Sequence, residues 1–188
     1  GLSAVRVGTR RVGGSSPERP LGSDPAPQPR EQCPDAVRGR MTAEPVFHTR
    51  GPVSAAGLSD GETPLGDFVA DVIRETAGAD LAIMNSGGIR APLPAGVVTV
   101  GDIYSALPFD NKIVTVRMEG WQVRQLLDFI ARRLGKGGFA QVSGVQFVIR
   151  SDRATNIRVG GEVLESNRTY RVATIDFLYE GGDGYTAF

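Results

Sequence analysis

Apolar residues recur at helical spacing in two segments of the chain. The first runs from Thr63 to Gly78, with a proline directly after the threonine. Its apolar members are Leu65, Phe68, Val69, Val72 and Ile73. Threonine is a frequent N-cap residue, proline fits the first helical turn, and glycine often ends a helix. The second segment runs from Val123 to Leu134 and is followed by Gly135. We expect both segments to be helices that turn an apolar face toward the core.

Shorter β-branched or alternating runs predict the strands. The expected strands are residues 81–84, 97–100, 112–118, 145–149, 157–159, 162–164 and 170–175. Gly160 and Gly161 separate two of these runs in the manner of a hairpin turn. Two helices against four or more strands predict an α+β fold, in which a mixed β-sheet is packed with two main helices.

The N-terminal quarter of the chain has a different composition. It is rich in proline, glycine, serine and arginine and shows no sustained apolar period. Such a segment buries too little apolar surface to offset the entropy of ordering. We expect residues 1–52 to be disordered or to lie outside the domain, and the domain to span residues 53–188. A short strand at Ala4 to Val7 that pairs elsewhere is the alternative for the segment.

The charge balance and the rare residues exclude several classes of function. Lysine and arginine total 21, as do aspartate and glutamate, so the net charge is zero and a nucleic-acid partner is not expected. Cys33 and His48 are the single cysteine and histidine of the chain, which argues against a built-in transition-metal centre. No apolar run approaches the roughly 18 residues needed to span a bilayer, so membrane insertion is not expected.

The clearest chemical candidate is the loop that follows the strand at residues 81–84. It reads Asn85-Ser86-Gly87-Gly88-Ile89-Arg90. Its glycines would let backbone N–H groups approach an anion, and an arginine can hold a phosphate bidentately. A tight turn that needs glycine's positive φ, with Arg90 solvated, explains the same residues equally well.

Three further residues lie in loops rich in glycine or proline. Phe109 and Phe177 are rings that would sandwich a planar base, or else fill the core beneath their loops. Asp183 stands between two glycines, where its carboxylate would accept hydrogen bonds from a sugar or cap its own turn. Residue types alone favour the structural role for each of the three.

Five motifs, in this order and spacing, resemble the C-terminal domain of the 5'-nucleotidase family. They are Thr63-Pro64-Leu65-Gly66-Asp67, Asn85-Ser86-Gly87-Gly88-Ile89-Arg90, Leu107-Pro108-Phe109, Gln141-Val142-Ser143-Gly144 and Gly181-Gly182-Asp183-Gly184-Tyr185. Each motif is weak alone, but the set is specific and spans about residues 52–188. Full-length members of the family hydrolyse nucleoside 5'-phosphates. Their N-terminal metallophosphatase domain holds two metals, and their C-terminal domain binds the nucleoside.

The resemblance implies roles for seven residues. Phe109 and Phe177 would stack the base, Asp183 would contact the ribose, Asn85, Gly88 and Arg90 would face ribose and phosphate, and Gly144 would line the base pocket. One departure concerns an arginine that many members place just before the first helix, where this chain has residues 59–61, Ser-Asp-Gly. Phosphate affinity or substrate choice is therefore open.

The same resemblance sets the expectations for cofactors, partners and location. With one histidine this chain has no candidate for the dinuclear site, so we expect no cofactor in it, no turnover by it alone, and two divalent metals in an N-terminal domain absent from this sequence. The expected partners are a nucleoside or nucleotide and a metallophosphatase domain, in cis or in trans. A typical full-length member would be extracellular, periplasmic or in the cell envelope. A stand-alone nucleoside-binding module and a degenerate, non-catalytic remnant remain alternatives to the hydrolase domain.

Overall fold

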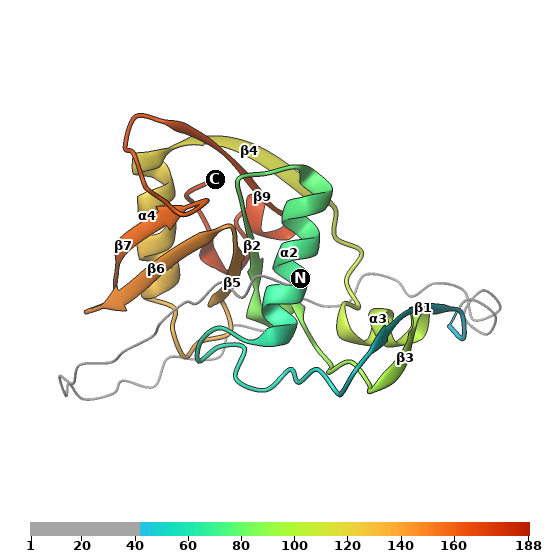
Figure 1. Ribbon diagram of the computed structural model, residues 1–188. Helices are drawn as coiled ribbons and strands as arrows, with labels where there is room; N and C mark the ends of the chain where they lie inside the picture. Colours follow the sequence, from blue (N-terminus) through green and yellow to red (C-terminus); the bar gives the residue numbers. More distant parts are fainter. Residues whose placement is uncertain (1–41) are drawn as a thin grey trace.

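A computed structural model describes residues 42–188, so the expectations for residues 1–41 lie outside the described part of the chain. Its elements, in chain order, are β1 (Pro45–Thr49), α2 (Pro64–Ala77), β2 (Leu81–Asn85), η1 (Ser86–Gly88), β3 (Gly96–Thr99), α3 (Val100–Ala106), β4 (Ile113–Glu119), α4 (Gly120–Ala131), β5 (Ala140–Ser143), β6 (Val145–Arg150), β7 (Arg153–Val159), β8 (Glu162–Val163), β9 (Thr169–Ile175), α5 (Asp176–Tyr179) and η2 (Gly182–Gly184). Figure 1 shows their arrangement.

The centre of the fold is a four-stranded mixed sheet with the order β4-β9-β2-β5. β2 runs parallel to β9, whereas β4 and β5 run antiparallel to their neighbours. Every residue of β2 is buried, as is most of β9, which requires cover on both faces of the sheet. The α+β class with a mixed sheet and two main helices is thereby confirmed.

The helices α2 and α4 supply that cover on opposite faces of the sheet (Figure 1). α2 begins where the sequence predicted: the Thr63 hydroxyl accepts a hydrogen bond from the N–H of Gly66 at 3.1 Å, and Gly78 ends the helix in the left-handed conformation. α4 ends at Ala131 rather than near Leu134, because the chain beyond it tightens into turns with i to i−3 bonds.

Two smaller sheets complete the domain. β6, β7 and β8 form an antiparallel sheet whose β7 packs on α4. The turn between β7 and β8 is Gly160-Gly161, both with positive φ, which confirms the predicted hairpin. β1 pairs with β3, so ordered structure begins upstream of the domain boundary expected at Val53. Strand pairing over a short stretch overrides the local composition here.

The apolar stripe predicted for α2 is only partly buried. Leu65, Val69 and Ile73 are buried as expected, whereas Phe68 and Val72 are 39% and 46% exposed. Phe68 and Val72 line an open groove instead of the core.

Candidate functional site

Four chain segments meet at one edge of the central sheet. β2 and β9 are parallel, so η1 and α5 leave their strands at the same edge. β4 and β5 are antiparallel to them, so the segments 107–112 and 132–139, which lead into these strands, arrive at that edge as well. The registers Ile113 with Ile175 and Asn85 with Ala140 fix the four segments at one level. This edge is the candidate site.

Asn85 and Asp183 form the polar centre of the edge. They are 98 positions apart, yet Asn85 Nδ2 donates a hydrogen bond to Asp183 Oδ2 at 2.7 Å. Asn85 is 1% exposed, and its Oδ1 has no hydrogen-bond partner among the described residues. A buried acceptor without a partner costs about 1–3 kcal/mol, which makes Asn85 an exception that calls for an explanation.

Asp183 has an unusual backbone conformation. Its φ is +52°, in the left-handed region that costs a non-glycine residue about 1–2 kcal/mol. The turn around it is closed by backbone bonds from Gly184 N to Gly181 O and from Tyr185 N to Gly182 O, each 3.1 Å long. Such conformations persist where the surroundings hold them, and they are common at binding sites.

The buried Tyr185, at the end of this turn, links it to a neighbouring segment. Its hydroxyl donates to the carbonyl oxygen of Gly138 at 2.9 Å, so the turn is joined to the segment that leads into β5. Burial, with a smaller effect of the Asp183 charge, raises the pKa of the Tyr185 hydroxyl above its ordinary value. The hydroxyl therefore stays neutral and continues to donate over the physiological range.

Phe177, in α5, is half-buried and packs against the same turn. A Cβ on Gly182 would come within 2.5 Å of Phe177 Cζ, so the absence of a side chain there lets the ring lie against the turn. The ring also packs against the edge of the core. One glycine thus places an aromatic ring next to the Asp183 turn.

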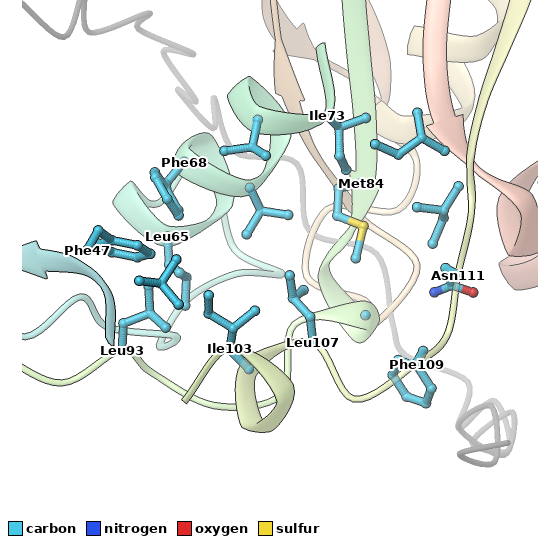
Figure 2. A pocket seen from close by; sticks show the side chains of 17 residues that line it. Phe47, Leu65, Phe68, Ile73, Met84, Leu93, Ile103, Leu107, Phe109 and Asn111 are labelled. Atoms are coloured by element: carbon cyan, nitrogen blue, oxygen red, sulfur yellow. The ribbon is translucent and has the colours of Figure 1, made fainter. Parts of the chain in front are cut away.

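Phe109 stands at one end of an apolar groove of about 440 Å³. Figure 2 shows Phe109 and Asn111 at this end and Phe47 with Phe68 at the other. Gly88 lines the groove too. A side chain at this position would overlap with the methyl group of Met84. Asn111 is the single polar residue of the lining, so most of the groove is unsuited to a sugar or a phosphate.

Arg90 lies at the surface of the edge. Its guanidinium donates a hydrogen bond of 3.3 Å to the carbonyl oxygen of Gly87, and its backbone N–H donates to Ala106 O at 2.8 Å. The backbone is thereby fixed while most of the guanidinium remains open to solvent. Arg90 is available to an anion at the rim of the site.

Gly144 is not brought to this group. β5 runs antiparallel to β2, so its C-terminal end lies beside the start of β2, opposite the edge that holds Asn85. At φ +73° Gly144 packs on Asp80, and a Cβ there would overlap with the Asp80 carbonyl oxygen. Its close backbone contact explains the glycine, and we leave Gly144 out of the site.

Sequence reasoning missed Arg133. Its guanidinium lies 4.8 Å from the ring centroid of Phe129 and adjoins Gly138 and Gly184, the second of which follows Asp183 directly. Arg133 falls in the turns after α4, a stretch that the helical period of the sequence includes in the helix. The signal in the sequence was the glycine-rich stretch that follows, Gly135-Lys136-Gly137-Gly138.

Neither a metal-binding cluster nor a membrane-spanning helix occurs in the described residues. Within residues 42–188 no three His, Cys, Asp or Glu side chains are grouped so that they could hold a metal ion. No helix in this part of the chain is both long and apolar enough to cross a bilayer.

Comparison with known proteins agrees with this architecture. Residues 41–188 match the family model described as 5'-nucleotidase, C-terminal domain. Protein UshA of Yersinia enterocolitica is 36% identical over 125 residues, which cover 66% of this chain and 23% of UshA. A 5'-nucleotidase of Vibrio parahaemolyticus is also 36% identical over 125 residues, covering 66% of this chain and 22% of the relative.

Solved structures of nucleotidases resemble this chain as well. The 5'-nucleotidase precursor from Thermus thermophilus superimposes with a TM-score of 0.72 at 28% identity, over 81% of this chain and 33% of that one. The NAD nucleotidase NadN of Haemophilus influenzae superimposes with a TM-score of 0.69 at 25% identity, over 81% and 32% of the two chains. The chain belongs to the 5'-nucleotidase family, and the part of the family that it represents is the C-terminal domain. It spans about a quarter of the length of the curated relatives that it matches.

Proposed function

We propose that this domain recognises the nucleoside part of a nucleotide, and that Phe109, Phe177, Asp183, Asn85 and Arg90 form the binding site. The observation that carries the proposal is the Asn85–Asp183 pair, a buried amide and a left-handed aspartate held 2.7 Å apart at the sheet edge where both rings lie. The buried Asn85 amide orients the Asp183 carboxylate, and Asp183 is itself partly exposed, so its carboxylate is suited to accept a hydrogen bond from a ribose hydroxyl.

The division of roles follows from the chemistry of each group. The partly exposed rings of Phe109 and Phe177 offer aromatic faces to a base. Asp183 has a second carboxylate oxygen for a sugar hydroxyl, and the solvent-facing guanidinium of Arg90 suits a phosphate. Gly88 is needed because any side chain would collide with Met84 behind the site.

We propose the hydrolysis of a nucleotide only for a longer protein that contains this domain. The matched region makes up 22% of the Vibrio relative named 5'-nucleotidase, and the family resemblance places two divalent metals in an N-terminal metallophosphatase domain. We propose that such a domain, in cis or in trans, supplies the metals and the chemistry, and that the site at the sheet edge presents the substrate. The product of that division of labour is a nucleoside and inorganic phosphate.

The test is the binding of adenosine and AMP to the 188-residue chain and to the variants Phe109→Ala and Phe177→Ala. Stacking on one ring is worth about 1–3 kcal/mol, so each variant should bind about fivefold to hundredfold more weakly. Phe68→Ala is the matched control, because Phe68 is a partly exposed ring at the far end of the groove. Calorimetric titration gives the affinity and thermal melting gives the stability.

Two results would contradict the proposal. One is wild-type protein that binds neither ligand at millimolar concentration. The other is a pair of variants that lose about 3–5 kcal/mol of stability, as buried phenylalanines do, while the remaining folded protein binds as tightly as the wild type.

A further inference from the structure

Arg133 is wedged between the two glycines that lie beside Asp183. A Cβ on Gly184 would lie 2.6 Å from Arg133 Nη2, and a Cβ on Gly138 would lie 2.8 Å from Arg133 Nη1. The same point on Gly138 is 3.3 Å from the Cβ of Asp183. The guanidinium and the Asp183 side chain therefore flank one glycine, and both glycines leave room for the guanidinium.

Aromatic rings hold the guanidinium in this place. It lies over Phe129 at 4.8 Å from the ring centroid, and Phe129 meets Tyr185 edge to face at 4.7 Å. A planar guanidinium stacks on a ring in a way that a lysine ammonium cannot. Tyr185, Phe129 and Arg133 thus form one contiguous cluster of side chains beside the turn that carries Asp183.

This cluster packs against a turn whose conformation the local sequence does not favour. Asp183 is a non-glycine residue at φ +52°, and the two backbone bonds of its turn do not by themselves select that conformation over others. The backbone N–H of Arg133 donates to Ile130 O at 2.9 Å, whereas its guanidinium forms no ion pair within residues 42–188 and packs against Phe129 and this turn.

We infer that Arg133 is a positioning residue: it holds the Asp183 carboxylate in place, and through it gives the site its selectivity for sugars with free 2' and 3' hydroxyls. The inference rests on the proposed function, in which Asp183 contacts the ribose. It goes beyond it by naming the residue that fixes Asp183 and the part of the ligand that this residue controls.

The experiment compares adenosine with 2',3'-dideoxyadenosine, which lacks both hydroxyls, on wild type and Arg133→Gln. Hydrogen bonds to a charged group are worth about 1.5–3 kcal/mol, so a displaced carboxylate should weaken adenosine binding about tenfold to hundredfold. Binding of the dideoxy compound should change by no more than about twofold, because it has nothing to offer Asp183. Arg132→Gln is the control: it removes the same charge from the exposed neighbouring residue and should leave both affinities unchanged.

Gly138→Ala provides a second perturbation that keeps the arginine. Its new methyl group would occupy the space of the guanidinium, so it should reproduce the pattern of Arg133→Gln. Equal weakening of both ligands in the two variants would show that Arg133 supports the domain as a whole, and undiminished preference for adenosine would show that it does not act on Asp183. Either result overturns the inference and leaves the proposed function standing. Failure of the wild-type chain to bind adenosine would remove both.

Discussion

The stability of the domain should depend on the protonation of Asp67. This residue lies in the first turn of α2, and burial, followed by the nearby charge of Glu62 and a hydrogen bond with it, raises its pKa from 3.8 to about 7. The carboxyl group is therefore protonated in the folded state at mildly acidic pH, where it can share its proton with Glu62. In the unfolded chain the same group ionises near its ordinary pKa.

The sign and size of the effect follow from this difference. Because the folded state binds the proton more tightly, the stabilisation is complete below pH 3.8 and is lost as the pH rises through about 7. A fully buried group with this pKa would change the unfolding free energy by about 4 kcal/mol. Asp67 is only partly buried, so solvent screening reduces the expected loss to about 1–2 kcal/mol.

Asp67→Asn separates this effect from other titrations. Asparagine cannot ionise but can still donate a hydrogen bond to Glu62, so it imitates the protonated carboxyl group. Between about pH 5 and pH 8 the melting temperature of the wild type should fall about 3–6 °C further than that of Asp67→Asn. Asp110→Asn removes a carboxylate from an exposed position and should behave as the wild type does. Parallel melting curves for wild type and Asp67→Asn across this range would refute the reasoning.

Two other substitutions test the structural account away from the site. Gln141→Ala removes a buried amide that makes four hydrogen bonds to the segment 58–63. Chemical denaturation should show a loss of about 2–4 kcal/mol in the unfolding free energy, and a loss below about 0.5 kcal/mol would contradict a structural role for these bonds. Gly144→Ala forces a Cβ into the Asp80 carbonyl at positive φ and should also cost about 2–4 kcal/mol, with the adenosine affinity of the folded protein unchanged. If Gly144→Ala bound adenosine more weakly, Gly144 would have to be counted among the binding residues.

Much of the fold was predictable because its signals are local. The cap, the proline and the terminal glycine fixed α2, and strict alternation fixed β6. The differences arise where distant segments decide the outcome. The strand β1 depends on β3, a partner far along the chain, and the exposure of Phe68 depends on what packs beside the helix. Neither is encoded in the period of the local sequence.

The candidate site, too, was predicted only in part from the sequence. The sequence motifs indicated Asn85 and Asp183 separately, but their hydrogen bond follows from the parallel pairing of β2 with β9, which no local pattern encodes. Gly144 lies elsewhere for the converse reason, since β5 carries it away from the edge in the antiparallel direction. The sequence did not indicate Arg133 because the contact that links it to the site is with Gly184, in a turn far along the chain.

Two buried amides on neighbouring strands show how the fold separates structure from binding. On β5, Gln141 accepts hydrogen bonds from the N–H and hydroxyl of Thr63 and donates to two carbonyl oxygens, so its polar atoms are satisfied within the protein. On β2, Asn85 faces the other side of the sheet, and the one partner of its side chain in the described residues is Asp183, with Oδ1 unpaired in this part of the chain. Leaving that acceptor unpaired opposes folding by about 1–3 kcal/mol, and holding Asp183 at positive φ adds about 1–2 kcal/mol. Both costs fall on the two residues that hold the Asp183 carboxylate at the sheet edge, which is the group that we propose receives the sugar.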